Sequence, residues 1–331
     1  MRDPFRAVMA RQQDKGYSVA LEELHERDLP REGGVLVEIA FSSLNYKDAL
    51  AVTGRGRIVR RFPMVLGIDL AGTVLESPSP EFKPGDHVLA VGQGLGETAW
   101  GGYAQAQRVR PDALLHVPEP LSPEEAMRVG TAGFTAMLCV LALERNEVRP
   151  SDREIVVTGA AGGVGSMAVH LLARRGFKVA ASTGRPEQSE YLKNLGAHSI
   201  VPREELAKKE GPMQSERWGG GIDTVGGEIL ANVFAQTVYG GAVACCGMAG
   251  GHELNTTVWP LILRNVSLLG VSSILTPKPR RIESWRQLAA TLDRNMLGAM
   301  SRTEPLSRIV ELSNEILSGH VRGRVVIDVN A

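Results

Sequence analysis

The chain of 331 residues has 37 lysine and arginine residues against 37 aspartate and glutamate residues, so its formal net charge is zero. This balance gives no support to nucleic acid or an anionic membrane as a partner, and no apolar run reaches the roughly 18 residues of a membrane span. Its three cysteines, Cys139, Cys245 and Cys246, are too few for a disulfide framework and predict a reducing, cytoplasmic location.

The N-terminal third of the chain has the pattern of a β domain. Residues 1–120 alternate short apolar runs with turn residues, and the clearest runs lie at 35–39, 67–74 and 83–89. Short strands at this spacing are typical of a barrel-like β domain.

The pattern becomes helical from about Pro123, and after residue 150 it changes again to short apolar runs that alternate with helical segments. Strands separated by helices predict a parallel, doubly wound sheet, so the fold class is α/β. We expect strands at 155–158, 179–182, 200–201, 222–225, 243–246 and 268–272. A last strand-like segment, 323–329, is expected to return to the N-terminal domain.

A glycine-rich turn follows the first of these predicted strands. Gly159, Gly162 and Gly165 have no Cβ atom, so the backbone can turn tightly and approach a pyrophosphate. The helix expected from about Gly163 to Arg175 would direct its free N–H groups at the phosphates. We therefore predict a dinucleotide site in which Ala161, Gly162, Gly163 and Val164 contact the cofactor. The alternative is a glycine-rich turn that binds no ligand.

The end of the next strand indicates which dinucleotide is bound. An NAD site normally has an acidic residue about 20 residues after the glycines, which accepts from the ribose 2′-hydroxyl. This chain has Ser182, Thr183, Gly184 and Arg185 there, and no carboxylate before Glu187. Hydroxyl groups and a guanidinium suit a 2′-phosphate, so we predict NADPH. Arg203, after the following strand, is a further candidate, although a loop arginine can also be merely solvated.

Several motifs between residues 42 and 273 give the chain a family resemblance. They are Ser42–Leu50 (SSLNYKDAL), Gly67–Gly72 (GIDLAG), the glycine turn, Asp223–Gly227 (DTVGG), Pro260–Val266 (PLILRNV) and Gly270–Ser273 (GVSS). With these motifs the sequence resembles the zinc-independent medium-chain dehydrogenases/reductases, in the quinone-oxidoreductase-like subgroup that contains acryloyl-CoA reductases.

The resemblance implies two domains with the active site in the cleft between them. Residues 1–125 and 298–331 would form a GroES-like substrate domain, and residues 126–297 a Rossmann domain that binds NADPH. It also implies that Met248, Ile262 and Ser273 lie near the cofactor, and that the protein forms a homodimer. The implied reaction is reduction of the C=C bond of an α,β-unsaturated acyl-CoA, such as acryloyl-CoA to propanoyl-CoA. A quinone or enone reductase, and a dinucleotide-binding protein without catalysis, remain as alternatives.

The sequence predicts that no metal is bound. Zinc-dependent relatives carry Gly-His-Glu where this chain has Gly67-Ile68-Asp69, and Ile68 cannot be a ligand. A structural zinc site needs about four closely spaced thiolates, and no cysteine occurs before Cys139.

Without zinc, another group must polarise the substrate. The resemblance places Asn45-Tyr46-Lys47-Asp48 at the nicotinamide end of the cleft, and the Tyr46 hydroxyl could donate a hydrogen bond or a proton there. Tyr46 is therefore the predicted catalytic residue and a cofactor contact, although it could also merely line the cleft. Basic residues at Arg55, Arg57, Arg322 and Arg324 could hold the phosphates of CoA, or could be solvated loop residues.

Overall fold

The computed structural model describes residues 3–13, 16–30, 34–208 and 210–331. The chain forms two compact units. Unit 1 consists of Met1–Thr131, Ile274–Ala289 and Leu297–Ala331, and unit 2 of Ala132–Ser273 and Ala290–Met296. These limits differ from the expected domains chiefly at residues 274–289, which belong to the unit that contains the N-terminal strands.

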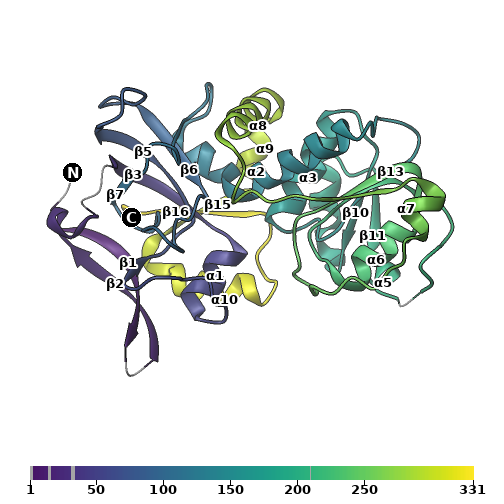
Figure 1. The fold of residues 1–331 in the computed structure, drawn as a ribbon, viewed down its shortest axis with the longest axis horizontal. Coiled ribbons are helices and arrows are strands. Elements are labelled where there is room, and N and C mark those ends of the chain that lie inside the picture. The colour runs from purple at the N-terminus through teal and green to yellow at the C-terminus, as the bar shows by residue number, and fades with distance from the viewer. Residues whose placement is uncertain (1–2, 14–15, 31–33, 209) are drawn as a thin grey trace. The chain divides into compact units, whose positions relative to one another are not determined.

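Unit 2 is built on a six-stranded parallel sheet in the order β11-β10-β9-β12-β13-β14 (Figure 1). In chain order this is 3-2-1-4-5-6, the arrangement of a Rossmann fold. Its strands are β9 (Ile155–Val157), β10 (Val179–Thr183), β11 (Ser199–Pro202), β12 (Trp218–Asp223), β13 (Thr237–Cys245) and β14 (Ser267–Gly270). Its helices are α3 (Gly163–Arg174), α4 (Ser189–Asn194), α5 (Arg203–Leu206), α6 (Gly227–Ala235) and α7 (Trp259–Arg264). The predicted doubly wound sheet is therefore confirmed.

The core of unit 2 explains why short apolar runs become strands here. Val156 on β9, Ala180 on β10 and Val243 on β13 are fully buried because helices cover the sheet. The order of strands reverses between β9 and β12, and ligands of such sheets bind at the carboxyl ends of the strands beside this point. The glycine turn directly follows β9, so it lies there.

Unit 1 contains two mainly antiparallel sheets. The smaller has the order β2-β1-β4, and the larger, seven-stranded sheet has the order β15-β16-β3-β5-β6-β8, with β7 paired to β3. The strands are β1 (Phe5–Gln13), β2 (Gly16–Leu24), β3 (Val35–Leu44), β4 (Met64–Val65), β5 (Asp69–Glu76), β6 (His87–Val91), β7 (Ala106–Val109), β8 (Leu115–His116), β15 (Ser301–Pro305) and β16 (Arg324–Asp328). Two of its helices are α1 (Tyr46–Thr53) and α10 (Ile309–Leu317).

The C-terminal strand returns to the N-terminal sheet, as predicted. β16 pairs antiparallel with β3, with Val326 opposite Ser43, and Figure 1 shows the two side by side. The hairpin of β1 and β2 was not predicted, nor was β15, which pairs parallel with β16. Because α10 and α1 pack against each other, the C-terminal segment also holds the helix that begins with Tyr46.

Three helices cross the limits of the units: α2 (Pro123–Arg145), α8 (Lys278–Thr291) and α9 (Arg294–Ala299). α2 is broken at Gly130, whose φ of 50° and ψ of −161° are not helical. Among the described residues it is the one helix long and apolar enough to cross a membrane. The expectation that the sequence contains no such segment counted only unbroken apolar runs, whereas this helix is apolar on average and includes polar residues. Within its most apolar stretch 78% is buried in the protein, as in a core helix.

Candidate functional site

The glycine turn leaves no space for side chains at two of its glycines. Gly159 has a φ of +59°, and a Cβ atom there would lie 2.4 Å from Thr224 Oγ1. A Cβ atom on Gly165 would lie 2.3 Å from the carbonyl oxygen of Gly159, so α3 approaches the turn as closely as the backbone allows. Both positions therefore require glycine.

The turn also presents the start of α3. Gly162 is the N-cap residue, has extended backbone and supplies no capping side chain, and its own N–H donates to Gly159 O at 2.9 Å. Gly163 and Val164 begin the helix, so their N–H groups belong to the first turn, which has no internal acceptors. An anion is favoured at such a helix start. Ala161 to Val164 therefore lie at the start of this helix, and their contact with a pyrophosphate stays a prediction.

A buried carboxylate holds the neighbouring loop against the turn. Asp223, at the end of β12, accepts from Thr158 Oγ1 at 2.7 Å and from the Gly226 N–H at 2.7 Å. Burial raises the pKa of Asp223, and these hydrogen bonds oppose the rise. From the sequence, residues 223–227 are recognisable only as a family motif, whereas in the structure their contacts fix the ends of β9 and β12 relative to each other.

The predicted 2′-phosphate residues lie together with the turn. The Ala160 N–H donates to Ser182 O at 3.0 Å, which joins the turn to the end of β10. Arg185 Nη2 donates to Ala161 O at 3.1 Å, and the Arg185 N–H donates to Thr183 Oγ1 at 3.1 Å. Arg185 therefore contacts the pyrophosphate turn as well as the end of β10.

Arg203 lies against Gly184. A Cβ atom on Gly184 would be 2.5 Å from Arg203 Cζ, so the guanidinium occupies the space that a side chain would fill. The pairing of β10 with β11 explains this contact. Thr183 stands opposite Pro202 at the ends of the two strands, so Gly184 and Arg203, which follow them, lie side by side. The Arg203 side chain stays 57% exposed. Two arginines thus lie beside the end of β10, as a 2′-phosphate would require.

Tyr191, which was not predicted as a site residue, supports the turn. Tyr191, on α4, donates from its hydroxyl to Ser166 Oγ at 2.9 Å, and Ser166 in turn donates to Ala160 O at 3.2 Å. The chain Tyr191–Ser166–Ala160 therefore joins α4 and α3 to the turn. A tyrosine in the polar segment after β10 was the only available signal.

Met248, Ile262 and Ser273 lie outside this cluster of contacts. Met248 is 71% exposed, in the loop after β13 that passes close to Gly226. Ile262 is 70% exposed on α7, which packs against β13, and Ser273 follows β14. Their contact with a cofactor stays a prediction.

In unit 1, Tyr46 is the first residue of α1 and is 46% exposed. Asn45 is the N-cap residue, and its N–H donates to Asp48 Oδ2 at 2.9 Å. The other Asp48 oxygen accepts from the Ile68 N–H at 2.8 Å. The start of α1 is therefore fixed by a buried carboxylate, while the Tyr46 ring reaches solvent.

A buried polar network surrounds Asn45. Asn45 Nδ2 donates to Asp48 Oδ2 at 3.0 Å and to Asp69 Oδ2 at 2.9 Å, while Asn45 Oδ1 accepts from Arg324 Nη1 at 3.1 Å. Burial, together with the nearby negative charge of Asp69, raises the pKa of Asp48 to about 7. The guanidinium of Arg324 is the cation that faces both carboxylates.

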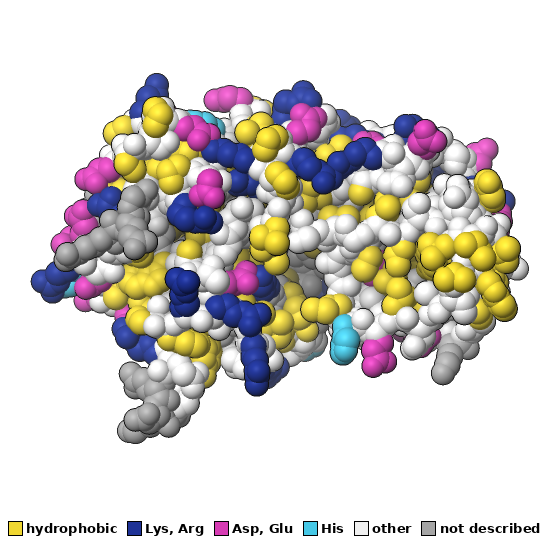
Figure 2. Space-filling model, viewed as in Figure 1, with side chains coloured by type: hydrophobic (Ala, Val, Ile, Leu, Met, Phe, Trp, Pro, Cys, Tyr) yellow, Lys and Arg dark blue, Asp and Glu magenta, His cyan; other side chains and the backbone are white. Residues whose placement is uncertain are grey.

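The prediction that Arg324 binds a CoA phosphate is wrong. Its side chain is buried, and its guanidinium donates to Leu44 O, Ser43 Oγ and Arg128 O as well as to Asn45. These contacts use its donors inside the protein, where a phosphate has no access. By contrast, Arg55, Arg57 and Arg322 are exposed, and Figure 2 shows basic side chains gathered over the part of unit 1 that contains α1.

Among the described residues no group of three or more His, Cys, Asp and Glu side chains could hold a metal ion. Asp69 itself accepts from Ser43 Oγ at 2.6 Å and from Thr131 Oγ1 at 2.5 Å. Its carboxylate is therefore engaged in hydrogen bonds, and the absence of a bound metal stays a prediction.

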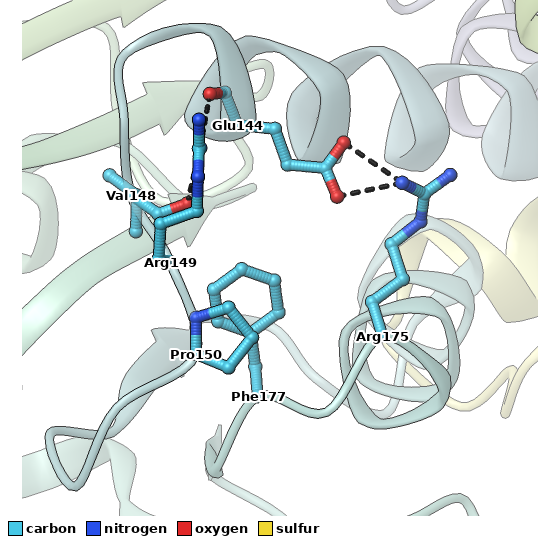
Figure 3. Close-up of a pocket in the computed structure, with 6 residues that line it drawn as sticks. All are labelled: Glu144, Val148, Arg149, Pro150, Arg175 and Phe177. Carbon is cyan, nitrogen blue, oxygen red and sulfur yellow. Dashed lines mark hydrogen bonds and ion pairs between the residues drawn. The ribbon is translucent and has the colours of Figure 1, made fainter.

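Unit 2 also has a pocket of about 260 Å³, which lies at the amino ends of the strands, whereas the glycine turn lies at their carboxyl ends (Figure 3). Val148 to Pro150, which precede β9, and Phe177, which precedes β10, form part of its wall. Arg175 reaches the Glu144 carboxylate at 2.7 Å. Because the pocket lies at the amino ends of the strands, it is distinct from the glycine turn.

A GroES-like unit and a Rossmann unit with this turn define a two-domain dehydrogenase or reductase. Residues 31–119 match the family model described as "Alcohol dehydrogenase GroES-like domain", and residues 163–294 match "Zinc-binding dehydrogenase".

Curated relatives match nearly the whole chain. "Probable acrylyl-CoA reductase AcuI" of Escherichia coli is 50% identical over 98% of this chain and 100% of the relative. "Acrylyl-CoA reductase AcuI" of Ruegeria pomeroyi is 48% identical over 94% of each chain, and "Putative quinone oxidoreductase YhfP" of Bacillus subtilis is 41% identical over 98% of each.

Two solved structures share the fold. E. coli YhdH with bound NADPH has a TM-score of 0.95 at 50% identity and covers 98% of this chain and 100% of that one. B. subtilis YhfP with NAD bound has a TM-score of 0.94 at 40% identity, with 99% and 100% covered. The chain belongs to the quinone-oxidoreductase-like group of the medium-chain dehydrogenases/reductases, as its motifs predicted.

Proposed function

We propose that the protein is an NADPH-dependent reductase of the C=C bond of α,β-unsaturated acyl-CoA thioesters, and that it converts acryloyl-CoA to propanoyl-CoA. The observation that carries the proposal is the identity of about 50% with two acrylyl-CoA reductases over nearly the full length of each. The site geometry supports it, because the residues expected to hold the pyrophosphate and the 2′-phosphate lie together in unit 2.

The residues of unit 2 fit the proposed cofactor. The backbone at Ala161 to Val164 offers N–H groups for a pyrophosphate. Gly165 has no side chain, and a Cβ atom there would collide with the carbonyl oxygen of Gly159, so α3 lies close against the turn. Arg185 and Arg203, with the hydroxyls of Ser182 and Thr183, would hold the 2′-phosphate that distinguishes NADPH from NADH. Bound there, NADPH supplies a hydride for the β-carbon of the unsaturated thioester.

The role proposed for Tyr46 concerns charge on the substrate. As the β-carbon gains a hydride, negative charge develops on the thioester oxygen, and a donor placed there stabilises it. The Tyr46 hydroxyl would donate to this oxygen or supply the proton that the α-carbon needs. Its position at the exposed start of α1, held by Asn45 and Asp48, supports this assignment.

The exposed arginines of unit 1 would bind the phosphates of CoA. Arg55 and Arg57 lie in the loop directly after α1, and Arg322 precedes β16. A simple quinone carries no phosphate and would gain nothing from these charges, so they favour a CoA thioester.

A quinone or enone reductase is the second candidate. The identity of 41% with a putative quinone oxidoreductase favours it, and the same reductive chemistry would serve. We test the two by following NADPH oxidation with acryloyl-CoA, crotonyl-CoA and a benzoquinone in parallel. Turnover with the thioesters is the expected result. Turnover with the quinone alone would refute the proposal, and no turnover with any would favour a dinucleotide-binding protein without catalysis.

We also propose a homodimer formed through the edge of the six-stranded sheet. β14 ends the sheet order, and the neighbouring α7 exposes Trp259, Ile262 and Leu263 by 50 to 70%. Figure 2 shows hydrophobic side chains gathered over this part of unit 2. A second copy would cover both the strand edge and the apolar side chains. Sedimentation of the wild type and of Ile262→Glu tests this, and a monomeric wild type would refute it.

The location and the functional domain limits are likewise proposals. The thiols of all three cysteines are free, which suits the cytoplasm. We propose residues 126–297 as the NADPH-binding domain, and residues 1–125 with 298–331 as the substrate domain.

A further inference from the structure

The buried polar network next to Tyr46 contains more negative than positive charge. Two carboxylates, Asp48 and Asp69, share the side chain of Asn45, and one cation, Arg324, faces them. All four side chains are buried. Because two negative charges in a low dielectric are opposed by one positive charge, the network favours one bound proton.

The hydrogen bonds show which carboxylate controls α1. Asp48 accepts from the Asn45 N–H at the N-cap, from Asn45 Nδ2 and from the Ile68 N–H. Asp69 lies on β5 and accepts from the side chains of Ser43, Asn45 and Thr131, whereas Asp48 belongs to α1 and also accepts the backbone N–H of the N-cap residue. A change of charge on Asp48 therefore acts directly on the residue that precedes Tyr46.

The orientation of the Asn45 amide is set from both sides. Arg324 donates to Asn45 Oδ1 at 3.1 Å, so the Nδ2 group must face the two carboxylates. Gly130 permits this arrangement, because a Cβ atom there would lie 2.6 Å from Arg324 Nη2 and 2.8 Å from Asp69 Oδ2. The broken turn of α2 thus makes space for the network.

We infer that Asp48 is a positioning residue for Tyr46, and that gain of a proton by Asp48 loosens the start of α1 and displaces the Tyr46 hydroxyl. A neutral carboxyl accepts the Asn45 and Ile68 N–H groups more weakly than a carboxylate does. The inference rests on the proposed function for its effect on catalysis, but its effect on Tyr46 does not depend on any substrate.

The surroundings of Asp48 place this change near neutral pH. Asp69 on β5 repels its charge, Arg324 on β16 attracts it, and Tyr103, which precedes β7, approaches it through a hydroxyl. On α1 itself, Lys47 is paired with Glu97 instead. Burial and Asp69 together raise the pKa of Asp48 to about 7, so the proposed change falls within the working range of an enzyme.

The test follows the Tyr46 ring and the reaction separately. The chain has five tyrosines, so ring-13C-labelled tyrosine gives few signals, and Tyr46→Phe identifies that of Tyr46. In the wild type we expect this signal to shift with a midpoint near pH 7. In Asp48→Asn it should not titrate, while Asp112→Asn, the same change at an exposed carboxylate of unit 1, should match the wild type.

The kinetic readout is the pH profile of NADPH oxidation with acryloyl-CoA. We expect wild-type kcat to fall below about pH 7. In Asp48→Asn the pH profile should be flat. Its kcat at pH 8 should be about tenfold lower than that of the wild type, because the capping box formed by Asn45 and Asp48 is weakened. KM for NADPH should change less than kcat, because the residues proposed to hold the pyrophosphate and the 2′-phosphate lie in unit 2, whereas Asp48 belongs to unit 1. A fold defect alone would not flatten the pH profile.

A Tyr46 signal that is constant from pH 5.5 to 8.5, or that titrates equally in Asp48→Asn, would overturn the inference. If Asp48→Asn does not fold, Arg324→Lys replaces it in the same experiment. Loss of the guanidinium fork should change the pH midpoint of the Tyr46 signal, and an unchanged midpoint would also overturn the inference. A Tyr46 signal that titrates in a protein without thioester turnover would refute the proposed function and leave the positioning role intact.

Discussion

The guanidinium of Arg203 occupies the space beside Gly184 that a side chain at that position would fill. The contact is a consequence of strand register, because β10 and β11 pair with Thr183 opposite Pro202. It joins the ends of two adjacent strands into one cationic surface. It also allows the NADPH assignment to be tested with a single methyl group.

Gly184→Ala should weaken NADPH selectively. The new Cβ atom would lie 2.5 Å from Arg203 Cζ, and the flexible arginine would move away without disturbing the backbone. We expect KM for NADPH to rise about fivefold, through partial loss of a charge-assisted hydrogen bond. KM for NADH and the melting temperature should stay at their wild-type values. A rise that is equal for both cofactors would contradict the placement of Arg203 at the 2′-phosphate.

Arg203→Ala and Arg185→Ala should differ in selectivity. Arg203 lies against Gly184 at the end of β10, so its loss should raise KM for NADPH about tenfold or more and leave NADH unchanged. Arg185 also donates to Ala161 O in the pyrophosphate turn. Arg185→Ala should therefore raise KM for NADH too, although less than for NADPH. Steady-state kinetics with both cofactors measures this, and an Arg203→Ala enzyme with wild-type NADPH kinetics would exclude the arginine from the site.

The six strands of unit 2 were predictable because buried parallel strands are continuous apolar runs. The first residues of β12 and β13 were not, since β12 begins Trp218-Gly219-Gly220 and β13 passes through Gly240 and Gly241, and glycine has low strand propensity. The hairpin of β1 and β2 was missed for another reason: β2 is exposed or half-exposed apart from Leu24, its one buried residue, and so lacks the continuous apolar run of a buried strand.

Local sequence also could not distinguish an arginine that binds a phosphate from one that is buried. Arg322 and Arg324 stand two residues apart, yet the first is exposed and the second is enclosed by residues of β3, α2 and the start of α1. That difference depends on the antiparallel pairing of β16 with β3, a contact across about 280 residues of sequence. Spacing alone contains no information on it.

Arg324→Met should destabilise unit 1 severely. The substitution keeps much of the side-chain volume but removes the guanidinium that faces Asp48 and Asp69. Breaking a buried ionic network in this way costs about 3–5 kcal/mol of the free energy of unfolding. Urea denaturation checks this, with Arg322→Met as the matched control at an exposed position, where we expect a change within about 0.5 kcal/mol. Equal effects of the two substitutions would contradict the buried network.

The stability of the protein should depend on pH through Asp48. Burial and the nearby charge of Asp69 raise the pKa of Asp48 in the folded state to about 7, from about 3.9 for an unperturbed aspartate. The folded protein therefore holds this proton more tightly than the unfolded chain, and the contribution to stability is full below about pH 4. It is lost as the pH rises to about 7, and the loss is of the order of 4 kcal/mol.

The difference in free energy of unfolding between wild type and Asp48→Asn isolates this contribution. Urea denaturation of both proteins at pH 4.5, 6 and 8 should show the wild type losing stability relative to the variant as the pH rises. A difference that is constant across the three pH values would mean that Asp48 has an ordinary pKa in the folded protein.

Arg55 and Arg57 should distinguish a CoA thioester from a quinone. Both are exposed in the loop after α1, so replacing them with alanine should leave the melting temperature within about 2 °C of wild type. Each lost contact to a phosphate reduces affinity, and we expect KM for acryloyl-CoA to rise about tenfold in the double variant. KM for a benzoquinone should not change, because that substrate has no phosphate. The charge-matched control is Arg60→Ala with Arg61→Ala, at two exposed arginines of the same loop, and an equal effect there would indicate general electrostatic attraction instead of a defined phosphate site.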